Sequence, residues 1–268
     1  MQKTNKNQKR SPIDRAMPLR SAGDSITEQI DLIKDDKLLT PLLAAVLTAF
    51  LAATEWIRYL NNSTPSPKTF TVLAIIAFAY LAYKFRDLRD EVRQLKLGRD
   101  GERLVANYLE ELRIYGFTVF HDVPTGDANV DHIIIGTKGV FTVETKTMLM
   151  PSRGDVKIKV ANGKIYANGN LLQRNPLIQA KAQANWLKNF LKESGFEIKR
   201  VWPVVAFPGW FVEPFDWKDE MAWVVEPKML QSKIERQSDR YSPEQVSAMV
   251  SALRSYVRSK LEKQTAIN

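Results

Sequence analysis

The chain has 268 residues, of which 44% are hydrophobic, so it is long enough for one sizeable core with accessory segments. It has no cysteine, which excludes disulfide bonds, thiolate zinc sites and cysteine nucleophiles. Its two histidines, His121 and His132, are too few for a metal site built mainly from imidazole, so any metal should be a hard cation held by carboxylates. The formal net charge of +9 favours a polyanionic partner, either nucleic acid or an anionic membrane surface.

Residues 1–37 are expected to form a basic, disordered cytoplasmic tail. Lysine and arginine dominate residues 1–23, where Asp14 is the one acid and large apolar residues are few. Residues 24–37 have isoleucines at helical spacing, which is compatible with a short amphipathic helix.

Residues 38–85 have the pattern of two transmembrane helices. Residues 38–54 contain no charge, and with an extension through Ile57 they reach the roughly 20 residues that a spanning helix needs. A polar, proline-containing loop follows at 61–68, and 69–83 is a second uncharged run. The alternative is a pair of buried helices in a soluble protein.

Positive residues flank this hairpin on both sides, whereas the loop has few. The positive-inside rule therefore places both termini, and the domain that follows, in the cytoplasm. We expect a multi-pass protein of the cell inner (plasma) membrane, with the lipid bilayer as one partner. Residues 86–96 are highly charged and predict a helical stalk, and stalk or transmembrane helices offer a route to a homo-oligomer.

Residues 97–268 predict one α/β domain with a C-terminal helix, since helical and strand patterns are mixed along it. Helices are expected at 98–115, 175–194 and 242–263, and strands at 117–123, 131–135, 140–145, 155–160, 164–167, 201–207 and 221–225.

The strands at 131–135 and 140–145 form a predicted hairpin with charged groups at its open end. Glu144 and Lys146 are two residues apart and so lie on one face, and Asp131 enters the first strand. The acid-x-lysine triplet alone is a weak signal, because Glu197/Lys199 and other pairs repeat it. Acids against an apolar core are costly unless paired or metal-bound, so the alternatives are a buried salt bridge and a metal site.

A set of motifs in this part of the chain resembles the nuclease-related domain (NERD) family, a branch of the PD-(D/E)xK nuclease superfamily. The motifs are Gly98-x-x-Gly101-Glu102 opening a helix, Asn129-Val130-Asp131-His132, Gly139-Val140-Phe141, Glu144-x-Lys146 and Gln179. The resemblance covers about residues 97–210, and the superfamily's proline before the first acid is Val130 in this chain. It implies a restriction-endonuclease-like mixed central sheet flanked by helices, preceded here by the transmembrane hairpin.

The resemblance also implies a divalent-metal-dependent site for cleaving phosphodiester bonds. Asp131 and Glu144 are the expected ligands of Mg²⁺ (or Mn²⁺), and Lys146 is expected to orient or deprotonate the attacking water. Glu102 either binds a second metal or is an ordinary acid near a helix N-terminus. Gln179 is expected to reach the phosphate or the lysine.

Three further expectations concern neighbouring residues. Gln183 is one turn from Gln179 on the same helical face, so it either reaches the phosphate or the lysine as well or is simply exposed. His132 is expected to point to the opposite face from Asp131, away from the catalysis. The alternatives for a group of basic residues are a phosphate-binding surface and ordinary solvated charges: Arg153, Lys157, Lys159, Arg174 and Lys181.

The sequence thus favours a membrane-anchored, metal-dependent nuclease that hydrolyses DNA, in DNA processing. The alternative is a membrane-tethered nucleic-acid-binding or scaffolding protein with an inactive nuclease-like site. A third hypothesis is an assembly factor whose soluble domain docks partners.

Overall fold

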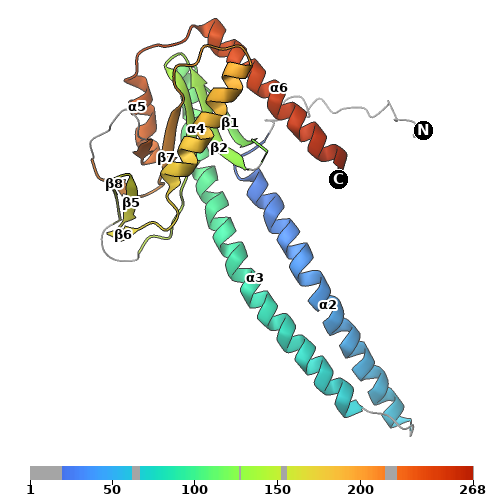
Figure 1. Ribbon diagram of the computed structural model, residues 1–268. Helices are drawn as coiled ribbons and strands as arrows, with labels where there is room; N and C mark the ends of the chain where they lie inside the picture. Colours follow the sequence, from blue (N-terminus) through green and yellow to red (C-terminus); the bar gives the residue numbers. More distant parts are fainter. Residues whose placement is uncertain (1–19, 62–66, 127, 152–155, 215–221, 268) are drawn as a thin grey trace, which may run out of the picture. The chain divides into compact units, whose positions relative to one another are not determined.

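The computed structural model describes residues 20–61, 67–126, 128–151, 156–214 and 222–267 (Figure 1). The chain divides into two compact units. Of the described residues, the helical unit contains those within 23–103 and 147–150, and the α/β unit contains those within 20–22, 104–146 and 151–267.

The helical unit is an antiparallel pair of long helices, α2 (Asp24–Leu60) and α3 (Pro67–Glu110), of which residues 67–103 belong to this unit. The two helices lie side by side along their length, as two contacts between them show. The Trp56 indole donates a hydrogen bond to Thr71 at 3.0 Å near the loop, and Lys37 pairs with Glu91 towards the other end. Residues 24–37, which the sequence placed in the basic tail, are the first turns of α2.

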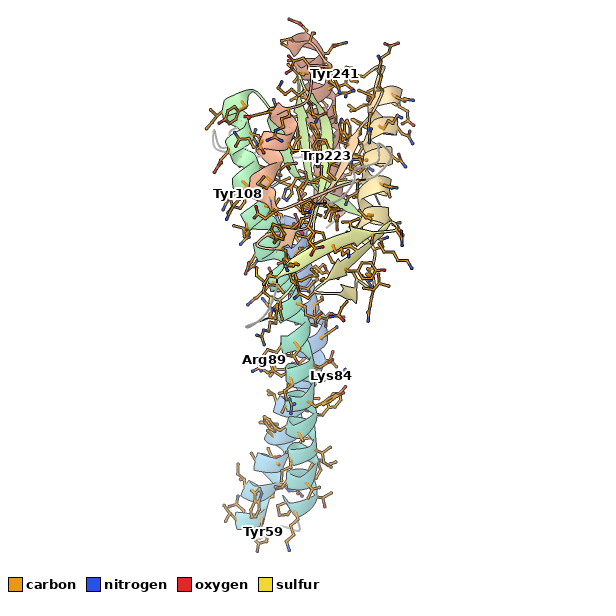
Figure 2. All side chains as sticks on the ribbon, turned by 90° about the vertical axis from the view of Figure 1, so that its left-hand side faces the viewer. Tyr59, Lys84, Arg89, Tyr108, Trp223 and Tyr241 are labelled. Carbon is orange, nitrogen blue, oxygen red and sulfur yellow. The ribbon has the colours of Figure 1, made fainter. Side chains whose placement is uncertain are left out.

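Both helices are long and apolar enough to cross a membrane. The most apolar stretch of α2 is only 17% buried, and that of α3 only 6%. Large side chains such as Phe50 and Ile75 are exposed. Figure 2 shows side chains projecting outward between Tyr59 at one end of the pair and Lys84 and Arg89 further along. The hairpin therefore presents an apolar outer surface instead of a buried one.

The helix expected to open at Gly98 does not begin there, because α3 runs through it without a break. A glycine in a helix interior costs roughly 1 kcal/mol relative to alanine, which the helical residues on either side outweigh. Gly101 has a packing reason, since a Cβ there would meet the Thr147 hydroxyl oxygen at 1.6 Å. Glu102 consequently lies inside a helix, and interpreting it as an acid near a helix N-terminus is wrong.

The α/β unit is built on a mixed five-stranded sheet with the order β1-β2-β3-β7-β9. Its strands are β1 (Thr118–Pro124), β2 (Asn129–Gly136), β3 (Gly139–Thr145), β7 (Trp202–Ala206) and β9 (Trp223–Val225). The first three strands pair antiparallel, and β7 joins β3 and β9 in parallel. The mixed central sheet that the sequence predicted is confirmed.

Helices cover both faces of this sheet. On one face α4 (Pro176–Glu193) and α6 (Pro243–Ile267) pack on a core that includes Ile133 and Leu187. On the other face the end of α3, the 3-10 helix η1 (Glu111–Tyr115) and α5 (Leu230–Glu235) enclose a core that includes Phe141 and Trp223. A short 3-10 helix, η2 (Pro227–Met229), precedes α5.

A second sheet was not expected as a separate element. It has the order β6-β5-β4-β8 and consists of β4 (Lys157–Ala161), β5 (Lys164–Ala167), β6 (Asn170–Leu171) and β8 (Phe211–Val212). We call it the small sheet. Because β8 follows β7 after a short connection, the small sheet is attached at the carboxyl end of β7.

Local signals set the starts of α4 and α6 as predicted. The Asn175 side chain accepts a hydrogen bond from the Leu177 amide at 3.1 Å and so caps α4, whose first residue is Pro176. Ser242 and Gln245 exchange backbone and side-chain hydrogen bonds at 2.9 and 3.3 Å, which is a capping box at the start of α6.

Candidate active site

The candidate site lies where β2 begins and β3 ends. The β2–β3 register pairs His132 with Val143, so the next pair outward is Asp131 with Glu144. Residues directly opposite each other in an antiparallel pair project to the same face. The Thr145 amide donates a hydrogen bond to Asp131 Oδ2 at 2.7 Å, which fixes this carboxylate beside the end of β3. The two acids therefore share one face of the sheet, as predicted.

Glu144 is the buried member of this pair, with 6% of its surface exposed. Its Oε2 accepts hydrogen bonds from two amides of α4, Gln183 Nε2 at 2.7 Å and Gln179 Nε2 at 2.9 Å. Burial raises the pKa of Glu144 from 4.5 to about 7, although the Gln183 hydrogen bond and the charge of Lys146 act in the opposite direction. A carboxyl held in this way is poised to change charge near neutral pH.

Lys146 is placed by the strand that carries Glu144. The Lys146 amide donates to the Ala206 carbonyl at 2.9 Å, which continues the β3–β7 pairing by one residue beyond Thr145. Strand alternation puts Lys146 on the face of Glu144, and its positive charge lowers the pKa of that acid. The lysine is only partly buried, unlike Glu144.

Of the two alternatives for Gln183, simple exposure is wrong. This residue is 7% exposed, because α4 packs this part of its surface against the sheet, while Gln179, one turn earlier, is exposed and still reaches Glu144. A spacing of four residues puts both amides on one face of α4, so the sequence pattern indicated that Gln183 faces the same group as Gln179.

The oxygens at this site are of the type that Mg²⁺ prefers. Asp131 and Glu144 supply two carboxylates, and Gln183 Oε1 is buried with no hydrogen-bond partner among the described residues. Mg²⁺ commonly takes one or two carboxylates and keeps several waters. Nowhere in the described part of the chain do three or more histidine, aspartate or glutamate side chains form a group able to hold a metal ion. A metal here would thus rely on two carboxylates and water.

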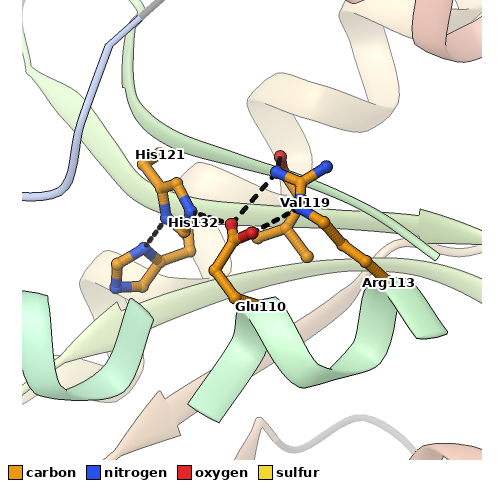
Figure 3. Close-up of polar contacts among 5 residues, drawn as sticks. All are labelled: Glu110, Arg113, Val119, His121 and His132. Carbon is orange, nitrogen blue, oxygen red and sulfur yellow. Dashed lines mark hydrogen bonds and ion pairs between the residues drawn. The ribbon is translucent and has the colours of Figure 1, made fainter. Parts of the chain in front are cut away.

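A chain of hydrogen bonds runs behind the site, on the other face of the sheet (Figure 3). Fully buried His132 lies with Nδ1 at 2.8 Å from His121 Nδ1 and with Nε2 at 3.3 Å from the Thr145 hydroxyl. His121 Nε2 in turn lies 2.7 Å from Glu110 Oε1, and Arg113 pairs with the same carboxylate. His132 points away from Asp131, as the sequence predicted.

The charge of Glu110 at the outer end determines which group donates and which accepts in each hydrogen bond of this series. Partial burial opposes ionisation of Glu110, but hydrogen bonds from Arg113 and His121 keep its pKa below 4.5, so the carboxylate accepts. Burial lowers the pKa of His121 and lowers that of His132 well below 6.5, so both rings are neutral at pH 7. Each ring then donates with one nitrogen and accepts with the other, and the Thr145 hydroxyl donates to His132. Thr145, whose amide holds Asp131, is therefore held in turn by the hydrogen bond from its hydroxyl to His132.

A buried ion pair lies at β1, the neighbour of β2 on the side away from β3. Arg20 Nε lies 2.9 Å from Asp122 Oδ2, and both side chains are at most 5% exposed. Asp122 Oδ1 accepts from the Asn129 side-chain amide at 2.7 Å, and the Asn129 carbonyl accepts from Gln183 Nε2 at 3.4 Å. Arg20, which the sequence assigned to the disordered tail, is thus a buried residue of the α/β unit.

The remaining predicted residues fall outside this cluster. Glu102 belongs to the helical unit, and its part in metal binding stays a prediction. Arg153 lies outside the described residues. Lys159, Arg174 and Lys181 are exposed and Lys157 is partly so.

Comparison with known proteins supports a nuclease-like assignment for this part of the chain. Residues 97–208 match the family model of the nuclease-related domain (NERD), which contains the hairpin, Lys146 and both glutamines. A search of curated proteins and a search of solved structures each found no significant match. The resemblance predicted from the sequence motifs is therefore confirmed as a match of residues 97–208 to this family model, and the two long apolar helices of the N-terminal part are candidate membrane spans.

Proposed function

We propose, starting from the nuclease-related domain at residues 97–208, that this protein is a membrane-anchored, divalent-metal-dependent nuclease that hydrolyses phosphodiester bonds in DNA. The observation that carries the proposal is buried Glu144, held by two α4 amides, with Lys146 two residues along and Asp131 on the same face. Burying a carboxyl group is costly, so its position beside a lysine and a second acid favours a catalytic role over a purely structural one.

Asp131 and Glu144 are the residues that would hold Mg²⁺ (or Mn²⁺). When bound, such an ion lowers the pKa of water and stabilises negative charge on phosphate oxygens. The protein residues have separate parts. Gln179 and Gln183 keep Glu144 Oε2 in place, and the Thr145 amide fixes Asp131. Lys146 orients the attacking water and counters the charge that develops on the phosphate.

The anchor is proposed to be the α2–α3 hairpin. Its exposed apolar surface lies between Tyr59 and the basic residues Lys84 and Arg89, an arrangement typical of a membrane span with an aromatic and a positive boundary (Figure 2). The positive-inside rule then puts both termini and the nuclease-related domain in the cytoplasm, at the inner (plasma) membrane. Acidic lipids would add to the attraction of a chain with a net charge of +9.

A labelling experiment tests this orientation. The chain has no cysteine, so single-cysteine variants can be labelled without background. In intact cells a membrane-impermeant maleimide should label Asn61→Cys, at the end of α2, and should label Ser255→Cys on α6 only after permeabilisation. The reverse pattern would contradict the orientation, and equal labelling of both in intact cells would contradict the anchor.

Cleavage of labelled DNA by the full-length protein in detergent micelles tests the activity. We expect cleavage that requires Mg²⁺ or Mn²⁺ and that Glu144→Ala abolishes. Glu197→Ala is a matched control, because Glu197 has the same acid-x-lysine spacing but is exposed. Metal-independent DNA binding without cleavage in the unmodified protein would contradict the nuclease and favour a membrane-tethered binding or scaffolding protein with an inactive site.

A further inference from the structure

The small sheet has two unlike faces. Ile158, Val160 and Ile165 point to one side and are at most 7% exposed, so this side is core. Strand alternation sends the neighbouring residues of β4 and β5 to the other side. The pairing of Tyr166 with Lys159 and Leu171, and of Lys157 with Phe211, brings residues from all four strands onto that outer side.

We call this outer side the lysine–aromatic face. It consists of Lys157, Lys159, Lys164, Tyr166, Leu171 and Phe211. Phe211 is 59% exposed and Leu171 50%, so this face presents a ring and an aliphatic side chain to solvent beside its lysines. One acid, Glu213, follows β8 at the edge of this face, where its amide donates to the Ile158 carbonyl at 2.8 Å. Positive charge therefore exceeds negative charge on the face.

The face is joined to the candidate site at two points. The Asn175 side-chain amide donates to the Gly163 carbonyl at 2.8 Å, so the β4–β5 turn is held against the N-terminus of α4, one turn before Gln179. In addition, β3 and β7 are parallel, so the chain leaves β7 towards β8 at the same edge of the main sheet where Lys146 ends β3.

We propose that the lysine–aromatic face binds single-stranded nucleic acid and delivers it to the site of Glu144 and Lys146. The inference rests on the proposed function, because it names the form of substrate that the site receives. Proteins that bind single strands combine cations that follow the backbone with aromatic rings on which bases stack. A duplex hides the faces of its bases inside the stack, so Tyr166 and Phe211 distinguish the two forms.

Binding of a fluorescein-labelled 20-nucleotide oligo(dT) to the full-length protein in detergent micelles, with a chelator to prevent cleavage, tests the proposal. Fluorescence anisotropy should show tighter binding of the single strand than of a duplex of equal length. Tyr166→Ala and Phe211→Ala should each raise Kd about fivefold or more, since stacking of one base is worth about 5- to 150-fold in affinity. Tyr115→Ala is the matched control, because Tyr115 is 54% exposed on η1, away from this face.

The salt dependence gives a second readout. Each lysine that contacts a phosphate of a single strand contributes about 0.7 to the slope of log K against log salt. Lys159→Gln should therefore reduce the slope by about 0.7, whereas Lys192→Gln, at an exposed position near the end of α4, should leave it unchanged.

Unchanged binding of oligo(dT) by the Tyr166 and Phe211 variants would overturn the proposal, and so would preference of the unmodified protein for duplex. If these variants change the oligomeric state without changing the DNA affinity, the face is a contact between copies of the chain and the proposal also fails. Lys146→Ala separates this inference from the proposed function. Loss of cleavage with normal oligo(dT) binding is expected for that variant. If the unmodified protein binds through the face but never cleaves, the nuclease proposal fails and the binding face stands.

Discussion

Replacing Glu144 with glutamine should make the α/β unit more stable at alkaline pH. The pKa of Glu144 is raised by burial from 4.5 to about 7, and the unfolded chain has the ordinary value. Between these two values the folded protein binds more protons than the unfolded chain, so the wild type loses stability as the pH rises through this window. Glutamine has the same shape and no charge to bury.

The size of the effect follows from the pKa difference. At about 1.4 kcal/mol for each tenfold change in proton affinity, a rise from 4.5 to about 7 corresponds to about 3 kcal/mol at pH 8. The substitution also changes the hydrogen bonds that Gln179 and Gln183 donate to this side chain, which shifts the stability by an amount independent of pH. The change with pH, and not the absolute gain, is therefore the specific prediction.

Urea unfolding of both proteins at pH 5 and pH 8, in the presence of a chelator, measures this change. The stability of Glu144→Gln relative to wild type should increase by about 2–3 kcal/mol between the two pH values. Subtraction removes the contributions of other titrating groups, including His121 and His132. Glu197→Gln, at an exposed position, should show no such trend. A difference between Glu144→Gln and wild type that does not vary with pH would refute the argument that burial controls this carboxyl.

Three further predictions address the metal, the histidine chain and a helix cap. At pH 8, Mg²⁺ should raise the melting temperature of the wild type and not that of Glu144→Gln, and equal rises would contradict binding at this site. His132→Leu leaves His121 Nδ1 and the Thr145 hydroxyl without their buried partner, so thermal melting should show a loss of about 2 kcal/mol or more, and a loss below 1 would contradict the hydrogen-bond chain. Asn175→Ala removes the α4 cap and should cost about 1 kcal/mol in urea unfolding, whereas Asn189→Ala on the exposed side of the same helix should cost nothing.

Local rules were enough to predict much of the site. Strand alternation placed Glu144 and Lys146 on one face, and the predicted hairpin brought the start of its first strand, with Asp131, near the end of its second. The register that sets Asp131 opposite Glu144 came from the structure. The cap at Asn175 fixed the start of α4 and therefore the face that Gln179 presents. Each of these inferences depends on residues close together in the chain, where spacing determines direction.

Other features depend on packing between distant segments. The burial of Gln183 follows from α4 lying against the sheet, and the ion pair between Arg20 and Asp122 joins residues about a hundred positions apart. The small sheet was missed as a unit because β6 and β8 are two residues each, too short to show any period. Gly98 was interpreted as a helix boundary, since a glycine alone does not reveal whether the helix continues through it.

The most direct test of the proposed nuclease compares Lys146→Ala with Lys199→Ala in single-turnover cleavage of a labelled DNA strand with Mn²⁺. Both lysines follow an acid at the same spacing, but Lys146 lies beside buried Glu144 and Lys199 is exposed. Lys146→Ala should bind the strand normally and cleave it at least about a hundredfold more slowly, as expected for loss of an electrostatic or general-base group. Equal cleavage rates for the two variants would contradict a catalytic site at the end of β3.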